Sequence, residues 1–143
     1  MRIFINVFKP GLDKIPMALH YAKGSRAERE LIEIFSSNGF SVIRAAGSGV
    51  SSLCPDILVF KRGMQYAIEA KAWETEHLHL DKDQFLGLKK WEENTGITTY
   101  VGWRRNRKDW IFIPPSIFEE REKSFTLSWK RAEGIGRKLS EFL

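Results

Sequence analysis

Residues 55–71 read PDILVFKRGMQYAIEAK, two apolar segments on either side of Arg62-Gly63. A two-residue loop that contains glycine is typical of a tight β-hairpin turn. The near-continuous apolar run at positions 57–60 indicates a strand that is covered on both faces, as in the centre of a sheet flanked by helices. The hairpin therefore predicts an α/β domain built around a mixed central sheet.

Three charged side chains lie at one end of this hairpin. With the turn at Arg62-Gly63, Asp56 falls directly opposite Glu69 across the antiparallel pair, where Cβ atoms are roughly 4.5–5.5 Å apart. Two carboxylates at that distance can share one hard cation, and Lys71 follows on the same face of the strand. The pattern predicts a divalent-metal site with a lysine beside it. This is the chemistry of phosphodiester cleavage, in which the lysine orients water or stabilises developing charge.

A plainer interpretation of the same residues stays open. Glu69 and Lys71 can form an exposed ion pair worth at most ~1 kcal/mol, and Asp56 can be an ordinary turn residue after Pro55. Charges at the ends of buried strands need partners, however, and a metal ion is one way to supply them.

Composition limits the class of protein. The chain has 143 residues, 43% of them hydrophobic, which suits one domain with a single core. Its 23 Lys and Arg against 18 Asp and Glu give a net charge of +5, which permits a polyanionic partner. The single cysteine, Cys54, excludes an intrachain disulfide and a cysteine-based zinc cluster and favours a cytoplasmic location. The apolar stretch at positions 3–8 is too short for a membrane span.

Periodicity and turn residues predict the other elements. Residues 1–17 read as a strand-like piece and a Pro/Gly-rich connector. Ser25 is the predicted start of a helix that Asn38-Gly39 ends, and Asp81 is the predicted start of a second helix that ends at Gly96. The predicted strands outside the hairpin are 40–45, 77–81, 98–103 and 110–113, and the predicted C-terminal helices are 116–122 and 132–142.

Four segments follow one another in the order KGSRAERELIEIFSSNGFSVIRAAGSG, PDILVF, Glu69-x-Lys71 and LDKDQFLGL. Together they resemble the archaeal Holliday junction resolvases of the restriction-endonuclease-like nuclease superfamily, and the match runs from about Tyr21 to Phe112. The resemblance implies that superfamily's fold, with residues 21–143 as a single nuclease domain and residues 1–20 as an N-terminal extension. The pattern covers neither the extension nor the stretch after residue 115.

The resemblance also implies a function. The expected activity is a structure-selective endonuclease that resolves four-way DNA junctions in recombination and repair by paired symmetric nicks, leaving 5′-phosphate ends. Mg²⁺ is the implied cofactor, with Mn²⁺ as a substitute, and a homodimer would match the two-fold symmetry of the junction. The alternatives are a nuclease of the same superfamily with another DNA substrate, and a non-catalytic junction-binding module.

Carried over residue by residue, the resemblance assigns metal binding to Glu28, Asp56 and Glu69. It makes Lys71 catalytic, with Ser48 completing the active site. The residues predicted to contact DNA are Lys23, Arg44, Ser48, Gln84, Arg104 and Arg105. The last two come from the basic loop RRNRKD, for which a solvated hairpin tip is the alternative.

Local interpretations compete with two of these assignments. Ser25-x-x-Glu28 and Asp81-x-x-Gln84 are both capping-box patterns, in which the side chain three residues after the cap bonds back to the backbone N–H of the cap residue. Helical spacing nevertheless places Glu28 at the border of the apolar stripe of its helix rather than in solvent.

Plainer interpretations also exist for Arg44, for Ser48 and for the segment around His77 and His79. Arg44 can be a solvated or ion-paired arginine rather than a phosphate clamp, and Ser48 can be a solvated loop serine. The alternation around His77 and His79 favours a half-exposed strand over a zinc cluster with Glu74 and Asp81.

Overall fold

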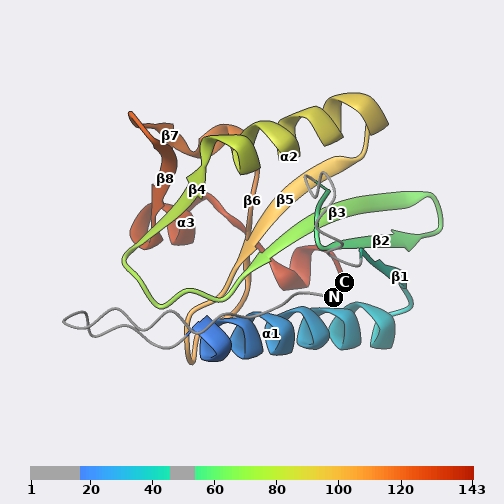
Figure 1. The fold of residues 1–143 in the computed structure, drawn as a ribbon. Coiled ribbons are helices and arrows are strands. Elements are labelled where there is room, and N and C mark those ends of the chain that lie inside the picture. The colour runs from blue at the N-terminus through green and yellow to red at the C-terminus, as the bar shows by residue number, and fades with distance from the viewer. Residues whose placement is uncertain (1–16, 46–53) are drawn as a thin grey trace.

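The structure is a computed structural model that describes residues 17–45 and 54–143, with side chains from residue 24 onward (Figure 1). A six-stranded sheet in the order β1-β2-β3-β5-β6-β9 forms the centre, and a smaller sheet has the order β4-β8-β7. The helices are α1 (Met17–Ser37), α2 (Lys82–Thr95) and α3 (Trp129–Ile135), with 3-10 turns at Pro115–Ile117 and Leu139–Glu141. The strands are β1 (Ser41–Arg44), β2 (Ile57–Lys61), β3 (Met64–Lys71), β4 (His77–Asp81), β5 (Thr98–Trp103), β6 (Ile111–Ile113), β7 (Glu119–Glu120), β8 (Ser124–Ser128) and β9 (Arg137–Lys138).

The hairpin at the centre of the large sheet is confirmed in its turn and register. Arg62 and Gly63 have φ values of 47° and 86°, the positive pair that a type I′ turn requires. Lys61 then pairs with Met64 along the antiparallel β2–β3 ladder. Because β3 pairs in parallel with β5 while the other pairs of this sheet are antiparallel, the sheet is mixed, as predicted.

Two cores lie on opposite faces of the six-stranded sheet. Tyr100 belongs to the core under α1, whereas its neighbours Val101 and Trp103 belong to the core under α2. This alternation follows from the strand period of two. Helix α1 consequently lies along one face and α2 along the other (Figure 1), and β3 between them contacts α1 and reaches Gln84 of α2 through Glu69.

The two helices flanking the sheet differ in how well their starts were predicted. The start of α2 is confirmed: Asp81 caps it and accepts a hydrogen bond from the Gln84 backbone N–H at 2.7 Å, and Gly96 ends it at φ 70°. The predicted start of α1 at Ser25 is wrong, because α1 begins at Met17 and Ser25 lies inside it. The helix therefore also crosses the expected boundary after residue 20. No helix among the described residues is long and apolar enough to cross a membrane.

The predicted C-terminal helix at 116–122 is wrong, because a 3-10 turn and strand β7 occupy that segment. The one predicted at 132–142 is right only in its first turn, since α3 ends at Ile135 and β9 follows. Strand β8, in the interval between the two predicted helices, pairs with β4, which buries Leu127 against Leu78. Helix α3 starts earlier than predicted because Ser128 caps it by accepting from the Arg131 backbone N–H at 3.2 Å. It ends before Gly136, where an added Cβ would meet a side chain of β6 at 2.0 Å.

Candidate active site

Strand β3 carries a buried carboxylate near its end. Glu69 is only 8% exposed. One of its oxygens, Oε2, accepts a hydrogen bond from Gln84 Nε2 at 2.9 Å and lies 3.4 Å from Lys71 Nζ. A buried charge needs such partners. The plainer interpretation, in which Glu69 and Lys71 form a solvated ion pair, is therefore wrong.

Asp56 lies beside this carboxylate, at the start of β2. Its Oδ2 accepts a hydrogen bond from the Ala70 backbone N–H at 2.9 Å, and its carbonyl accepts one from Ala45 N–H at 2.8 Å. Asp56 is thus fixed between β1 and β3 and is more than a turn residue. Its carboxyl lies within hydrogen-bonding reach of both Glu28 and Glu69.

The third carboxylate comes from the helix on the other side. Glu28 of α1 bonds to Arg44, the last residue of β1, at 3.2 Å. The capping-box interpretation of Glu28 is wrong, because its side chain points to Asp56 and Arg44 and Ser25 does not start the helix. Arg44 is half exposed and ion-paired, which is the plainer of its two interpretations.

Gln84 has a divided role. Its backbone N–H satisfies the Asp81 cap, but its side chain donates to Glu69 rather than back to the cap. The reciprocal half of the predicted capping box is therefore absent at this position, and Gln84 joins the carboxylate cluster through α2.

The ionised forms of the three carboxylates are disfavoured, because the pKa of each is raised. The pKa of Asp56 is raised from 3.8 to about 7, chiefly by burial and then by the charge of Glu69. Burial also raises the pKa of Glu69, although the Lys71 ammonium partly opposes this. The pKa of Glu28 is raised by burial and by the charge of Asp56.

This donor set fits a hard divalent cation, which prefers carboxylate oxygens and would relieve their mutual repulsion. Within the described part of the chain, however, no three His, Cys, Asp or Glu side chains are arranged so that they could hold a metal ion as they stand. Arg44 bonds to Glu28, while Lys71 and Gln84 contact Glu69. A bound cation would compete with these cationic and amide donors for the same oxygens.

The other predicted site residues are less closely connected to the cluster. Ser48 lies outside the described residues, and so does the side chain of Lys23, whose backbone belongs to α1. Arg104 forms an ion pair with Glu30 of α1, and Arg105 pairs with Glu76 at 3.1 Å. The base of the basic loop between β5 and β6 is thus attached to the domain, whereas residues 106–109 at its tip are exposed, as the solvated-tip alternative expects.

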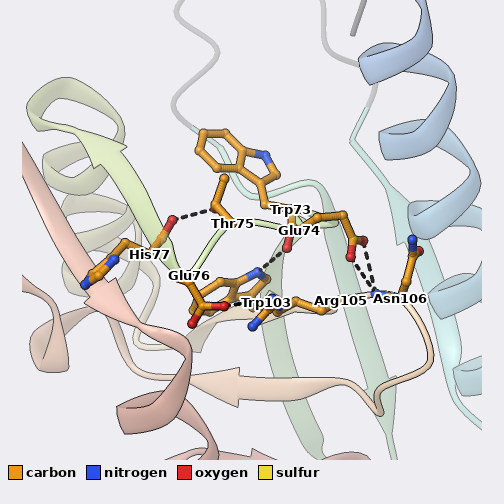
Figure 2. A network of polar contacts seen from close by, with 8 residues as sticks. All are labelled: Trp73, Glu74, Thr75, Glu76, His77, Trp103, Arg105 and Asn106. Atoms are coloured by element: carbon orange, nitrogen blue, oxygen red, sulfur yellow. Dashed lines mark hydrogen bonds and ion pairs between the residues drawn. The ribbon is translucent and has the colours of Figure 1, made fainter. Parts of the chain in front are cut away.

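Sequence reasoning missed the connector between β3 and β4, residues 72–76. Figure 2 shows it beside the β5–β6 loop, with polar contacts to Trp103, Arg105 and Asn106. The only sequence signal was an isolated tryptophan, Trp73, shortly after Lys71.

The order of these residues along the chain and their fold match a known family. The model of the archaeal Holliday junction resolvase family matches residues 19–143. The chain belongs to this family. Its members are metal-dependent nucleases, in agreement with the carboxylate cluster described above.

Individual relatives give the same result. The crossover junction endodeoxyribonuclease Hjc of Archaeoglobus fulgidus is 37% identical over 107 residues, which are 74% of this chain and 79% of that protein. The Hjc of Methanocaldococcus jannaschii is 29% identical over 83% of this chain and 92% of its own length.

Solved structures confirm the restriction-endonuclease-like fold. The A. fulgidus Hjc structure, described as a Holliday junction resolvase, superposes with a TM-score of 0.74 at 31% identity and covers 84% of this chain and 94% of its own. A bacterial homing endonuclease superposes with a TM-score of 0.52 at 14% identity, covering 81% of this chain and 87% of its own. The second likeness shows the fold alone.

The raised carboxyl pKa values predict how the stability of the metal-free protein depends on pH. The folded state keeps the Asp56 proton to higher pH than the unfolded chain does, so the free energy of unfolding should fall as pH rises from about 4 to about 7. The full shift corresponds to about 4 kcal/mol, and partial solvent contact should reduce this to roughly 1–2 kcal/mol. Glu28 and Glu69 act in the same direction.

Urea unfolding in EDTA between pH 4.5 and 7.5 would measure this dependence. Asp56→Asn should flatten it and should be more stable than the wild-type protein at pH 7.5. A wild-type protein whose stability rises over this interval would contradict the prediction.

Proposed function

We propose that this chain is a Mg²⁺-dependent endonuclease that cuts four-way DNA junctions. The observation that carries the proposal is the cluster of Glu28, Asp56 and Glu69, whose charges act on one another, with Lys71 3.4 Å from Glu69, in a chain of the resolvase family. The relatives are named for crossover junction cleavage, which supplies the substrate class.

The three carboxylates would hold the cation, and Mn²⁺ would serve in place of Mg²⁺. When bound, the metal supplies charge that offsets the scissile phosphate and activates water for in-line attack. The expected products carry 5′-phosphate and 3′-hydroxyl ends.

The chain's own groups position the reaction. The Lys71 ammonium next to Glu69 would stabilise the negative charge that develops on the phosphate, or orient the attacking water, in a site where little bulk solvent weakens its field. Gln84 fixes the orientation of the same carboxylate from α2 through its amide. The hydroxyl of Ser48 would add a further contact to the scissile phosphate.

Binding would depend mainly on the DNA backbone. Arg44 lies next to the cluster and is half exposed, so it can exchange Glu28 for a phosphate. Lys23, Arg104 and Arg105 are the other proposed phosphate contacts. The last two would have to release Glu30 and Glu76 to make such contacts, so we expect smaller contributions from them.

We further propose that the working unit is a homodimer, because two symmetric nicks require two sites related by the two-fold axis of the junction. A cytoplasmic location, expected from the single cysteine, stays a prediction.

Cleavage and binding assays on two DNA forms would test the proposal. With Mg²⁺, a four-way junction should be cut by paired symmetric nicks, whereas a linear duplex of the same sequence should remain largely intact. With Ca²⁺, the junction should compete for binding far better than the duplex, and affinity should fall steeply with salt.

The alternatives give different results. Efficient cutting of linear duplex would favour a related nuclease with another substrate. Junction binding without products in Mg²⁺ or Mn²⁺ would favour a non-catalytic binding module.

A further inference from the structure

The connector between β3 and β4 presents an exposed tryptophan close to Lys71. Trp73 is 39% exposed, whereas Trp103, Trp110 and Trp129 are at most 4% exposed. Among the large hydrophobic side chains that are exposed in the described part of the chain, it is the one aromatic residue. The domain covers the rest of this side chain, but contact with water contributes little for an apolar ring, so packing within the domain does not account for its exposed part.

The backbone that carries this indole is firmly held. Trp103 Nε1 donates to the Trp73 carbonyl at 2.9 Å, and the Asn106 backbone N–H donates to the Glu74 carboxylate at 3.0 Å. Figure 2 shows the indole of Trp73 directed away from these contacts. The side chain is therefore presented from a fixed position, which lowers the entropic cost of using it in binding.

The indole also lies beside the candidate active site. Lys71 Nζ is 5.9 Å from the centre of the Trp73 ring and 3.4 Å from the Glu69 carboxylate. If the scissile phosphate lies at the carboxylate cluster, a nucleotide next to it lies within reach of this ring.

We propose that Trp73 stacks on a DNA base at the branch point, next to the cut phosphate, and thereby favours junctions over continuous duplex. Bases in a continuous duplex already stack on both neighbours, whereas a base splayed at a branch point has a free face. Stacking on an aromatic side chain is favourable for any base, so this contact would recognise DNA shape rather than sequence. The inference rests on the proposed function and names the substrate feature that the site would detect.

Binding measured with Ca²⁺ would test this contact. Trp73→Ala should bind a four-way junction about tenfold more weakly and bind linear duplex with unchanged affinity, and Trp73→Phe should lie in between. Ile135→Ala, which removes a comparably exposed apolar side chain on α3, should match the wild-type protein. The substitutions at Trp73 should preserve the fold, because Trp103 bonds to the backbone carbonyl of this residue rather than to its indole.

A fluorescent base and a double mutant give independent readouts. A 2-aminopurine at the branch point should be quenched by the wild-type protein and less quenched by Trp73→Ala. The loss of junction affinity should persist in a Lys71→Met background if the indole contacts DNA directly rather than through the lysine.

The outcomes separate this inference from the proposed function. Junction-selective binding by the wild-type protein with unchanged Trp73→Ala affinity would overturn the inference alone. The same holds if the affinity loss appears equally on duplex, if it disappears in the Lys71→Met background, or if it comes with a changed oligomeric state. A wild-type protein without junction selectivity would overturn the proposed function and this inference together.

Discussion

Replacement of Asp56 by asparagine should abolish DNA cleavage while leaving junction binding nearly intact. Asp56 is the carboxyl that connects the other two, since it lies within hydrogen-bonding reach of both Glu28 and Glu69. The amide keeps an oxygen that can accept from Ala70 N–H, so the local backbone should not change. Loss of its charge removes the central metal ligand, and we expect the single-turnover rate to fall at least about a thousandfold.

Single-turnover cleavage of a labelled junction with saturating enzyme would measure this effect, with affinity determined separately in Ca²⁺. Asp83→Asn makes the same chemical change at an exposed position in the first turn of α2 and should cut like the wild-type protein. Glu69→Gln should behave like Asp56→Asn. A wild-type cutting rate in either of these two variants with Mg²⁺ would show that the assignment of the site is wrong.

The Asp56–Glu69 part of the carboxylate cluster could be predicted because the turn residues fix the register of the hairpin, whereas Glu28 was assigned to it from the family resemblance. Arg62-Gly63 admits a type I′ turn, and that turn fixes which residue of the second strand lies opposite Asp56. The start of α2 could also be predicted from the sequence, because an aspartate followed three residues later by glutamine is a signature of a helix start.

The start of α1 could not be read in this way. Gly24-Ser25 has the composition of a helix start, but the helix continues through it from Met17. The placement of β8 depends on its pairing with β4, far away in the sequence, and local periodicity does not report such pairing. The position of Trp73 likewise depends on a bond from Trp103, 30 residues later in the chain.

Replacement of Lys71 by methionine should slow cleavage about 10²- to 10³-fold with a smaller effect on junction affinity. Methionine keeps most of the apolar stem of this largely buried side chain but removes the ammonium next to Glu69. The loss should appear in the single-turnover rate, because the ammonium acts mainly on charge that develops in the transition state.

A second effect of replacing Lys71 concerns metal binding. Because Lys71 lowers the pKa of Glu69, its removal should raise that pKa, and protons should compete with Mg²⁺ up to higher pH.

Cleavage rates measured across pH and Mg²⁺ concentration would separate the two effects of this substitution. Lys71→Met should need a higher pH than the wild-type protein to reach half of its own maximal rate, and that maximum should stay low at any Mg²⁺ concentration. Lys71→Arg keeps the positive charge and should retain the wild-type pH dependence, with a reduced rate because the guanidinium is larger than the ammonium it replaces. If saturating Mg²⁺ at high pH restored the full rate of Lys71→Met, the lysine would act only on the carboxylates, and its proposed contact with the scissile phosphate or the attacking water would be wrong.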